Sequence, residues 1–389
     1  MPFYFIKFLA FDQHKRFVTI GLMEPKAKTH FWNKWKWTRL HQFLHDQHGV
    51  RYFVITLGLV IAVGLGLWGC LAMQPAPTVY KQQSIPKKKV VPPTYHSPLT
   101  GVQVPDETTT KRQVTAIMIE NSPDARPQSG LKDAGVVFEA VAEGGITRFI
   151  ALYQESRPGL IGPVRSVRPY YVEWAAAFDP AVAHIGGSAR ALQMIRSGNY
   201  GVDLDQFFNA GAYWRATDRY APHNVYTNFD RMDALTSAKG KATSSFTSWP
   251  RVDEKKSAQP NATNINIGVS TGSYVVDYAY DAASNSYIRK EGGANHVDRE
   301  GGQIQPKVVI AMKVNMTLGF EDGYREQIDT NGSGQAYIFQ NGTVTEATWS
   351  KADPKAQIKF VGADGKEVSL VRGQTWITAL DKNKNVSWQ

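Results

Sequence analysis

The pattern of hydrophobic positions is dominated by one long apolar run. Residues 52–73 read YFVITLGLVIAVGLGLWGCLAM and contain no charged side chain. An α-helix needs about 20 such residues to cross the ~30 Å hydrocarbon core of a bilayer. Rings near both ends of the run, from Tyr52 and Trp68, favour the level of the lipid headgroups. The pattern therefore predicts one transmembrane helix that contacts membrane lipid over residues 52–73.

Beyond this run the pattern changes twice. Residues 74–98 are rich in Pro, Lys, Gln and Ser, which predicts an extended stalk. From Thr115 onward, short apolar runs alternate with segments of helical spacing, as is typical of an α/β domain. The predicted strands are Thr115–Ile119, Gly135–Ala142, Arg148–Gln154 and Ala181–Ile185, and the predicted helices are Tyr170–Phe178, Ser188–Ile195 and Asn228–Ser237.

After about Pro250 the helical spacing fades and strand patterns take over. The predicted strands are Asn264–Val269, Tyr274–Tyr280, Val308–Val314, Ala336–Phe339, Gln357–Val361, Val368–Val371 and Thr375–Leu380. The dipeptides Asn341-Gly342 and Asp364-Gly365 each lie between two apolar runs, which indicates two-residue hairpins. We therefore predict an α/β first domain over residues 99–248 and a mainly antiparallel β domain over residues 249–389.

Charge is distributed unevenly around the apolar run. Residues 1–51 carry nine basic and three acidic side chains, whereas residues 74–96 carry four lysines and no acid. The larger basic bias predicts that the N-terminal tail is cytoplasmic and that the C-terminal bulk lies outside the cytoplasm. The length of the tail favours an uncleaved anchor over a cleaved secretory signal. Its mixture of aromatic and basic residues suits a segment on the inner membrane surface, and a partner-binding tail is the alternative.

The overall charge of +10 does not indicate a nucleic-acid partner. Residues 97–389 contain 31 basic and 31 acidic side chains, so the excess lies beside the membrane, where anionic lipid explains it. The single cysteine, Cys70, lies within the apolar run, so no disulfide can form within the chain. The residues before Cys70 faintly resemble a lipoprotein cleavage site, but the bulky Trp68 favours an unmodified, buried thiol.

The densest group of polar motifs lies between Glu143 and Asn224, where the predicted strands give way to loops. Arginines recur there, and a Gly-rich turn precedes a helix that Ser188 is placed to cap. Guanidinium groups bind phosphate bidentately, and a helix N-terminus adds backbone donors. One interpretation is an anion site built from Arg148, Arg165, Arg168, Arg219 and Ser188. The alternative is that these arginines form surface ion pairs with nearby carboxylates, which contribute only about 0 to 1 kcal/mol each.

Two residues are candidates for proton transfer. His223 lies in a polar loop, and imidazole titrates near neutral pH. Glu143 ends a predicted strand beside the same arginines. His184 instead follows three apolar residues, which favours a core histidine bound to a backbone carbonyl. No His pair at helical spacing, Cys cluster or Gly-x-Ser-x-Gly elbow is present, so we predict no metal and no cofactor, and a serine hydrolase is unsupported.

Several motifs resemble those of the YerB-type family of bacterial cell-envelope lipoproteins, a two-domain family of unknown function. In order along the chain they read ARPQSGL, EGGITRF, IGPVRSVRPYY, HIGGSARA, APHNVYT, GSGQAYIFQNGTVTEATW and GQTWI. The resemblance spans about residues 97–380 and implies an envelope-facing bacterial protein without an established reaction. It marks Glu143, Arg148, Arg165, Arg168, Ser188 and His223 as motif positions, and it adds Ser166, His184 and Asn224 to the expected ligand contacts.

The N-terminal region departs from that family. Its members typically carry a short signal that ends in a lipidated Cys, whereas this chain has a long basic tail before a full membrane span. The departure argues against lipidation and adds a cytoplasmic segment.

Three functions compete at this point. The first is a binding module for an anionic, phosphorylated envelope ligand, such as a lipid-linked pyrophosphate or a wall-polymer fragment. The second is a phosphotransferase or hydrolase that acts on such polymers, with His223 or Glu143 as proton carrier and the arginines stabilising the developing charge. The third is a scaffold whose β domain binds envelope proteins, which requires an exposed apolar patch. We favour binding or scaffolding over catalysis.

Overall fold

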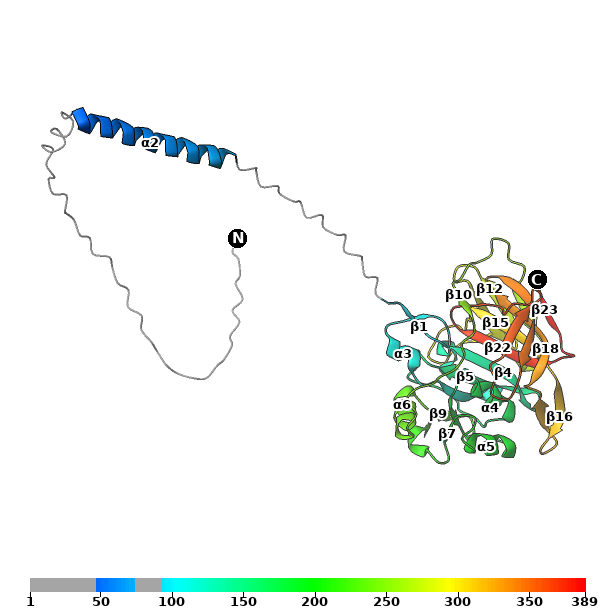
Figure 1. The fold of residues 1–389 in the computed structure, drawn as a ribbon. Coiled ribbons are helices and arrows are strands. Elements are labelled where there is room, and N and C mark those ends of the chain that lie inside the picture. The colour runs from blue at the N-terminus through cyan, green and yellow to red at the C-terminus, as the bar shows by residue number, and fades with distance from the viewer. Residues whose placement is uncertain (1–46, 74–92) are drawn as a thin grey trace, which may run out of the picture. The chain divides into compact units, whose positions relative to one another are not determined.

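The computed structural model describes residues 47–73 and 93–389, and the chain divides into two units, residues 1–89 and 90–389. The first unit contains helix α2, Gln47–Ala72 (Figure 1). Its segment His48–Ala72 is long and apolar enough to cross a membrane. The predicted helix at residues 52–73 is therefore present and begins five residues earlier. Most of the predicted tail and most of the predicted stalk lie outside the described residues.

The compact second unit begins before the predicted end of the stalk. Strand β1 (Tyr95–His96) pairs antiparallel with β2 (Gln103–Val104), and the short helix α3 (Glu107–Lys111) follows. The hydroxyl of the buried Ser97 donates a hydrogen bond of 2.7 Å to Glu155. Residues 95–98 thus pack as part of this unit, because buried hydrogen bonds fix them.

A sheet of 12 strands forms the centre of the compact unit. Ten of them follow the order β20-β19-β18-β15-β22-β4-β5-β3-β6-β7, and the hairpin β16–β17 joins through a pairing of β17 with β4. The strands are β3 (Thr115–Glu120), β4 (Val136–Glu143), β5 (Ile146–Tyr153), β6 (Ala181–His184), β7 (Val202–Asp205), β15 (Val308–Val314), β16 (Met316–Phe320), β17 (Arg325–Ile328), β18 (Gly332–Gln340), β19 (Thr343–Lys351), β20 (Lys359–Gly362) and β22 (Thr375–Asp381).

Strand β22 joins the two segments that the sequence separates at residue 249. It pairs in parallel with β15 on one side and with β4 on the other. The α/β segment and the β-rich segment therefore follow each other along the chain as predicted, but they share one sheet. The prediction of a mainly antiparallel second segment holds for its hairpins and misses the parallel β22.

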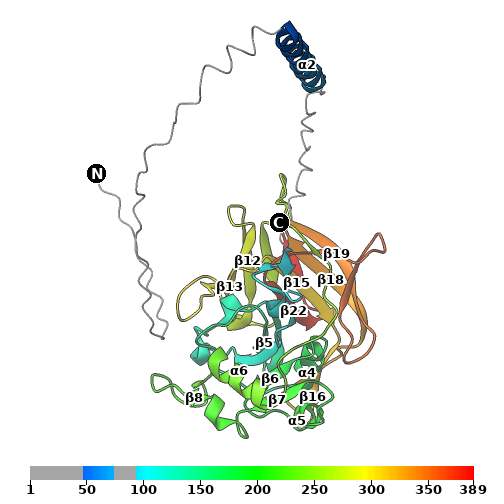
Figure 2. The same ribbon diagram turned by 60° about the vertical axis from the view of Figure 1, so that its left-hand side comes forward.

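Side chains alternate between the two faces of this sheet, and different elements cover each face. Helices α4 (Pro169–Ala176) and α5 (Ala189–Arg196) cover one face, where Phe138 stacks on Trp174 with ring centroids 5.5 Å apart. Helix α6 (Phe229–Ala238) covers the other face over β3, β5 and β6. Figures 1 and 2 both show the three helices gathered at the same end of the unit.

A second, five-stranded antiparallel sheet packs on the face that α6 covers, over β15 and β22. Its order is β14-β13-β12-β11-β23, and Tyr287 lies in a cluster with Val309 and Leu380 of the large sheet. The strands are β11 (Asn264–Ile267), β12 (Val276–Asp281), β13 (Ser286–Glu291), β14 (Ala294–Asn295) and β23 (Val386–Trp388). Two small pairings complete the unit: β8 (Trp214–Arg215) with β9 (Val225–Tyr226), and β10 (Arg251–Val252) with β21 (Leu370–Val371). Single-turn helices are η1 (Pro123–Ala125), η2 (Leu131–Asp133), η3 (Ala210–Ala212) and η4 (Gly272–Tyr274).

Candidate functional site

The predicted site residues lie at one edge of the large sheet. Strands β3, β4, β6 and β7 run in the same direction, so their carboxyl ends lie along one edge. These ends carry Glu120, Glu143, His184 and Asp205. Ligands of α/β proteins bind at such an edge, because loops rather than strands follow there.

Glu143 lies between two buried arginines. Its Oε1 accepts a hydrogen bond of 2.6 Å from Arg148, and its Oε2 accepts one of 2.8 Å from Arg168. Burial favours the neutral acid, but the two guanidinium charges outweigh it and hold the pKa of Glu143 below its usual value. Burial and the neighbouring Arg148 lower the pKa of Arg168. Glu143 is therefore an ionised hydrogen-bond acceptor, which suits it poorly to carry a proton.

The same two arginines also bind the backbone. Arg148 donates from Nη1 to the carbonyl of Ser166 at 2.9 Å, and Arg168 donates from Nη1 to the carbonyl of Val167 at 2.9 Å. Arg148 is only 3% exposed and Arg168 only 5%. The structure brings Glu143, Arg148, Ser166 and Arg168 together, and it uses both guanidinium groups to hold the loop before α4.

Arg219 and Asn224 connect two loops. Arg219 donates hydrogen bonds of 2.7 Å to the carbonyls of Ala125 and Pro127. The amide of Asn224 donates to the carbonyls of Ala216 and Arg219 at 3.2 Å. Both side chains thus satisfy backbone groups of loops that no strand pairing covers.

His184 is a fully buried core residue, which agrees with the alternative weighed from the sequence. Its Nδ1 lies 2.8 Å from the carbonyl of Gly186, and its Nε2 lies 3.0 Å from Asp203. Burial opposes ionisation of Asp203, but the hydrogen bond from His184 keeps the pKa of this carboxyl below its usual value. Ser188 is the N-cap residue of α5, but its buried hydroxyl makes no capping hydrogen bond.

A polar cluster at the end of β3, which we call the Glu120 cluster, holds the remaining predicted residues. It consists of Glu120, Ser122, Arg165 and His223. Oε1 of Glu120 accepts a hydrogen bond of 3.0 Å from Ser122, and it lies 3.0 Å from Nδ1 of His223 and 3.2 Å from Nε of Arg165. Oε2 of Glu120 is buried without a hydrogen-bond partner in the described chain.

Two members of the Glu120 cluster are open to solvent. The side chain of Arg165 is 27% exposed and that of His223 is 13% exposed. Nε2 of His223 lies on the far side of the ring from Glu120 and is 4.0 Å from the exposed Asp124. The edge of Tyr220 meets the imidazole with ring centroids 5.5 Å apart. An imidazole with one nitrogen beside a carboxylate and the other directed outward can donate or accept a proton at Nε2.

Glu120 and Ser122 were not predicted as site residues. Glu120 directly follows the predicted strand Thr115–Ile119, and Ser122 lies two residues further on, so a search for polar residues at strand ends finds both. The contact with His223 joins residues 103 positions apart, and no local spacing reveals it.

A buried ionic network between the two sheets was also missed. Arg289 and Glu139 are fully buried and 3.1 Å apart, and Arg289 also donates to His296 at 2.8 Å. Although burial favours the neutral form of Arg289, the charge of Glu139 raises the pKa of the guanidinium. Burial raises the pKa of Glu291 and, with the charge of Arg289, lowers the pKa of His296. Because solvent does not reach these groups, we assign the network a structural role.

Metal-ligating side chains are dispersed in the described ranges. Across residues 47–73 and 93–389, no three side chains of His, Cys, Asp or Glu come together in a way that could hold an ion.

Two family models match consecutive parts of the chain. Residues 99–243 match the model "Protein of unknown function (DUF3048) N-terminal domain", and residues 264–377 match the corresponding C-terminal domain. The chain is 35% identical over 308 residues to "Putative lipoprotein YerB" of Bacillus subtilis (strain 168), across 76% of this chain and 90% of that protein.

The fold agrees with a solved structure. The crystal structure of the YerB protein from Bacillus subtilis matches with a TM-score of 0.68 and 32% sequence identity, and the match covers 75% of this chain and 99% of that one. The resemblance drawn from the motifs is thus confirmed, as is the succession of an α/β segment and a β-rich segment. This chain belongs to the DUF3048 family, because it matches the models of both of the family's domains.

Proposed function

We propose that this protein is tethered to the membrane by α2, faces the outside of the cytoplasm, and binds an anionic, phosphorylated envelope ligand at the Glu120 cluster. The length and composition of α2 support the tether. The Bacillus relative is named "Putative lipoprotein YerB", which supports a place at the membrane. The excess of basic residues before the helix supports the orientation.

The observation that supports binding of this ligand is that the terminal nitrogens of Arg165 make no hydrogen bond within the described chain. Arg148, Arg168 and Arg219 direct their terminal nitrogens to partners within the chain. The shortest contact between Arg165 and Glu120 is through Nε, and within the described ranges no hydrogen bond engages the two Nη groups of Arg165. Two free Nη donors form the fork that binds phosphate oxygens bidentately. Arg165 is therefore the arginine that can bind an anion without breaking the fold.

The test is calorimetry on the full chain in lipid nanodiscs, with inorganic pyrophosphate and with a polyprenyl pyrophosphate. Arg165→Gln should weaken binding at least about tenfold, because a charge-assisted hydrogen bond contributes about 1.5 to 3 kcal/mol. Arg372→Gln is the matched control. Arg372 is 31% exposed and also meets its carboxylate, Asp253, through Nε. Equal affinity of the wild type and Arg165→Gln would refute the proposal, and binding of the polyprenyl probe alone would identify the lipid-linked source.

Orientation has its own test. Protease added to intact spheroplasts should release the compact unit and leave the tail of residues 1–51 protected. A digested tail beside an intact compact unit would reverse the proposed topology.

One specific observation favours catalysis as a second function. His223 stands between the buried Glu120 and the solvent, which is the placement of a general acid or base. If the site hydrolyses its ligand, the full chain should release phosphate from polyprenyl pyrophosphate, and His223→Gln should abolish release while His96→Gln, at an exposed histidine of β1, should not. Absence of release by the wild type would leave binding as the function.

The scaffold hypothesis has no comparable support in the compact unit. Its exposed large apolar side chains come from five segments of the chain: the adjacent Phe207 and Phe208, Leu318 and Tyr324 in the β16–β17 hairpin, and the single residues Tyr220, Val252 and Val297. Envelope protein partners stay a prediction.

A further inference from the structure

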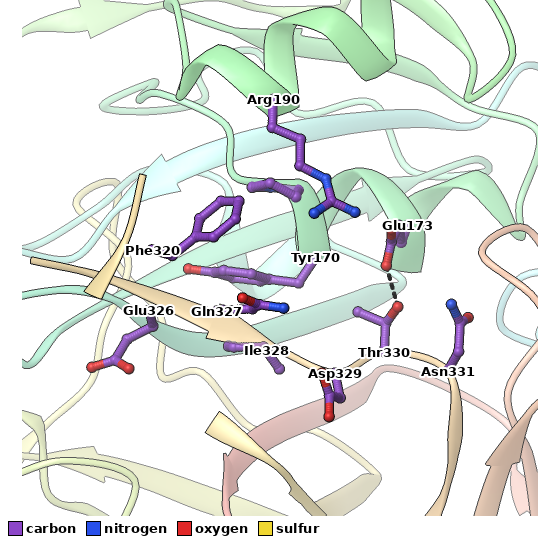
Figure 3. A pocket seen from close by; sticks show the side chains of 11 residues that line it. Tyr170, Glu173, Arg190, Phe320, Glu326, Gln327, Ile328, Asp329, Thr330 and Asn331 are labelled. Atoms are coloured by element: carbon purple, nitrogen blue, oxygen red, sulfur yellow. Dashed lines mark hydrogen bonds between the residues drawn. The ribbon is translucent and has the colours of Figure 1, made fainter. Parts of the chain in front are cut away.

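A small cavity lies beneath the β16–β17 hairpin, away from the Glu120 cluster. It has a volume of about 160 Å³ and is bounded by α4, the first turn of α5, β17 and residues 329–331 (Figure 3). The lining residues are Pro169, Tyr170, Glu173, Arg190, Phe320, Glu326, Gln327, Ile328, Asp329, Thr330 and Asn331. Helices and hairpin come from the two segments of the family, so the cavity exists only in the assembled unit.

The hairpin is fastened over the cavity at its turn. Oε1 of Glu321 accepts a hydrogen bond of 2.9 Å from the backbone N–H of Arg190, in the first turn of α5. A carboxylate at this position is stabilised because the first amides of a helix lack partners within the helix. Arg325 holds Glu321 in turn, at 3.3 Å. The chain thus already fills the anion position of α5 with its own carboxylate.

Arg190 leaves its guanidinium group available. The group lies over the ring of Phe320 at 5.8 Å, and no hydrogen bond or ion pair within 4.0 Å joins it to any carboxylate among residues 93–389. Figure 3 shows Arg190 reaching from α5 into the space between Tyr170 and Glu173. A guanidinium group beside an aromatic ring and without an anion can bind a carboxylate.

Carboxylates outnumber this single cation in the lining. Glu173, Glu326 and Asp329 contribute three acidic groups. Thr330 donates its hydroxyl to Glu173, and Asn315 donates its amide to Asp329 at 3.3 Å. None of the three forms an ion pair within 4.0 Å in the described part of the chain. Burial and the nearby Asp381 raise the pKa of Glu326, so a cation placed there would stabilise its ionised form.

Part of the remaining wall is apolar. Tyr170 is buried, and its hydroxyl donates a hydrogen bond of 2.8 Å to the carbonyl of Val141, so its ring is the part that lines the cavity. Ile328 is buried beside it. A cavity of about 150 Å³ in another protein holds benzene, so the enclosed part takes roughly six to eight non-hydrogen atoms, and a slightly longer ligand would extend into the open mouth of the cavity.

We infer that this cavity binds a small amino acid, with its carboxylate on Arg190 and its ammonium group beside Glu173, while Glu326 and Asp329 add negative charge to the same lining. Even with Lys351, whose charge interacts with that of Glu173, the acids of the lining outnumber the nearby bases, which favours a basic amino acid whose second ammonium group balances the excess of negative charge. The apolar carbons of the ligand would contact Tyr170 and Ile328. This site is separate from the anion site proposed at the Glu120 cluster and takes a ligand of different charge.

The experiment is calorimetry on the full chain in nanodiscs with ornithine, Nα-acetylornithine and glutamate, each in both enantiomers. Ornithine should bind. Glutamate should bind at least about tenfold more weakly because its second carboxylate is left unpaired, and Nα-acetylornithine should do so because it lacks the α-ammonium group. Arg190→Gln should weaken ornithine binding by a similar factor. Arg196→Gln, on the same helix but paired with Asp205 at 3.1 Å, is the control and should bind normally.

Several results would overturn the inference. They are no binding of ornithine at millimolar concentration, equal affinity of Arg190→Gln and the wild type, or tighter binding of glutamate. Arg165→Gln should retain ornithine binding, so failure of the pyrophosphate experiment and failure of this one are distinguishable. Circular dichroism of each variant separates loss of binding from loss of folding.

Discussion

At the scale of single residues, the compact unit is organised by charges that solvent does not reach. Glu139 accepts hydrogen bonds of 3.1 Å from Trp376 and Thr378 in addition to its ion pair with Arg289. Arg289 also binds the hydroxyl of Tyr278 at 3.0 Å. Buried ion pairs contribute little to the free energy of unfolding when they are intact. Loss of one partner is strongly destabilising, however, because it leaves an unpaired buried charge.

Arg289→Gln should therefore lower the free energy of unfolding by about 3 to 5 kcal/mol. The exposed pair of Arg372 with Asp253 is worth only about 0 to 1 kcal/mol, so Arg372→Gln serves as the control. Urea unfolding of the full chain in nanodiscs, followed by tryptophan fluorescence, measures both. An equal decrease in the free energy of unfolding for the two variants would show that the buried network is no more important for stability than an exposed ion pair.

Asp298 makes stability depend on pH. Its oxygens accept hydrogen bonds from the backbone N–H groups of Leu131 and Lys132, at 3.0 and 3.2 Å. Burial raises the pKa of this carboxyl to about 7. The folded state then holds a proton that the unfolded chain releases near pH 4, so this contribution is full below about pH 4 and is lost as the pH rises to about 7.

Replacement of the Asp298 carboxyl should therefore change how the free energy of unfolding depends on pH. The free energy of unfolding of the wild type, relative to Asp298→Asn, should fall between about pH 4 and pH 7 and stay constant above. Comparison with the variant is needed because the lowered pKa of His296 gives the opposite trend in part of this range. Urea titrations at several pH values decide, and a difference that is flat or rises with pH would contradict the assignment.

The sequence predicts which residues lie at the edge of the sheet better than it predicts which side chains contact each other. Motif positions such as Arg148 and His223 do reach the carboxyl edge of the sheet, because strand ends can be located from apolar runs. Which carboxylate each one meets could not be predicted. Arg289 lies 150 positions from Glu139, and only the packing of one sheet on the other brings them together.

At the scale of elements, the strength of the apolar pattern decides what a sequence predicts. Helices α4, α5 and α6 lie within one or two residues of their predicted bounds. Asn341 and Gly342 both adopt positive φ, 57° and 77°, which confirms the hairpin between β18 and β19.

Strands with many polar residues were not predicted. Examples are β7 (VDLD), β13 (SYIRKE) and β17 (REQI), and β16 was missed although it reads MTLGF. The neighbouring strands of the sheet, rather than an apolar period of their own, stabilise them.

The β16–β17 hairpin should respond to loss of its fastening. Glu321→Gln replaces a charged acceptor at the N-terminus of α5, where such contacts are worth about 1 kcal/mol. Amide hydrogens of residues 316–328 should then exchange about fivefold faster with deuterium. Asp322→Asn, in the same turn but paired with Arg325 rather than α5, is the control. Unchanged exchange in Glu321→Gln would show that strand pairing alone holds the hairpin.

At the scale of the whole molecule, both segments of the family complete one sheet. The apolar pattern locates their strands, and it places the change from α/β to β-rich character near residue 249. Parallel pairing of β22 between β4 and β15 could not be predicted, because strands with two buried faces carry no mark of their neighbours.

A shared sheet predicts that the compact unit unfolds as a whole. Circular dichroism and tryptophan fluorescence of the full chain should give one transition with the same urea midpoint, since separation of the segments would expose β4 and β22 along their full length. Two transitions would instead support separately stable domains that divide near residue 249.

The position of β22 also has a consequence for biosynthesis. Its partner strand β4 ends at Glu143, about 230 residues earlier in the chain. At roughly 5 to 20 residues per second, the ribosome needs on the order of 10 to 50 s to supply the missing neighbour. During that interval β4 presents an unpaired hydrogen-bonding edge, which is a template for aggregation. We therefore expect that shielding of this edge during synthesis raises the yield of folded protein.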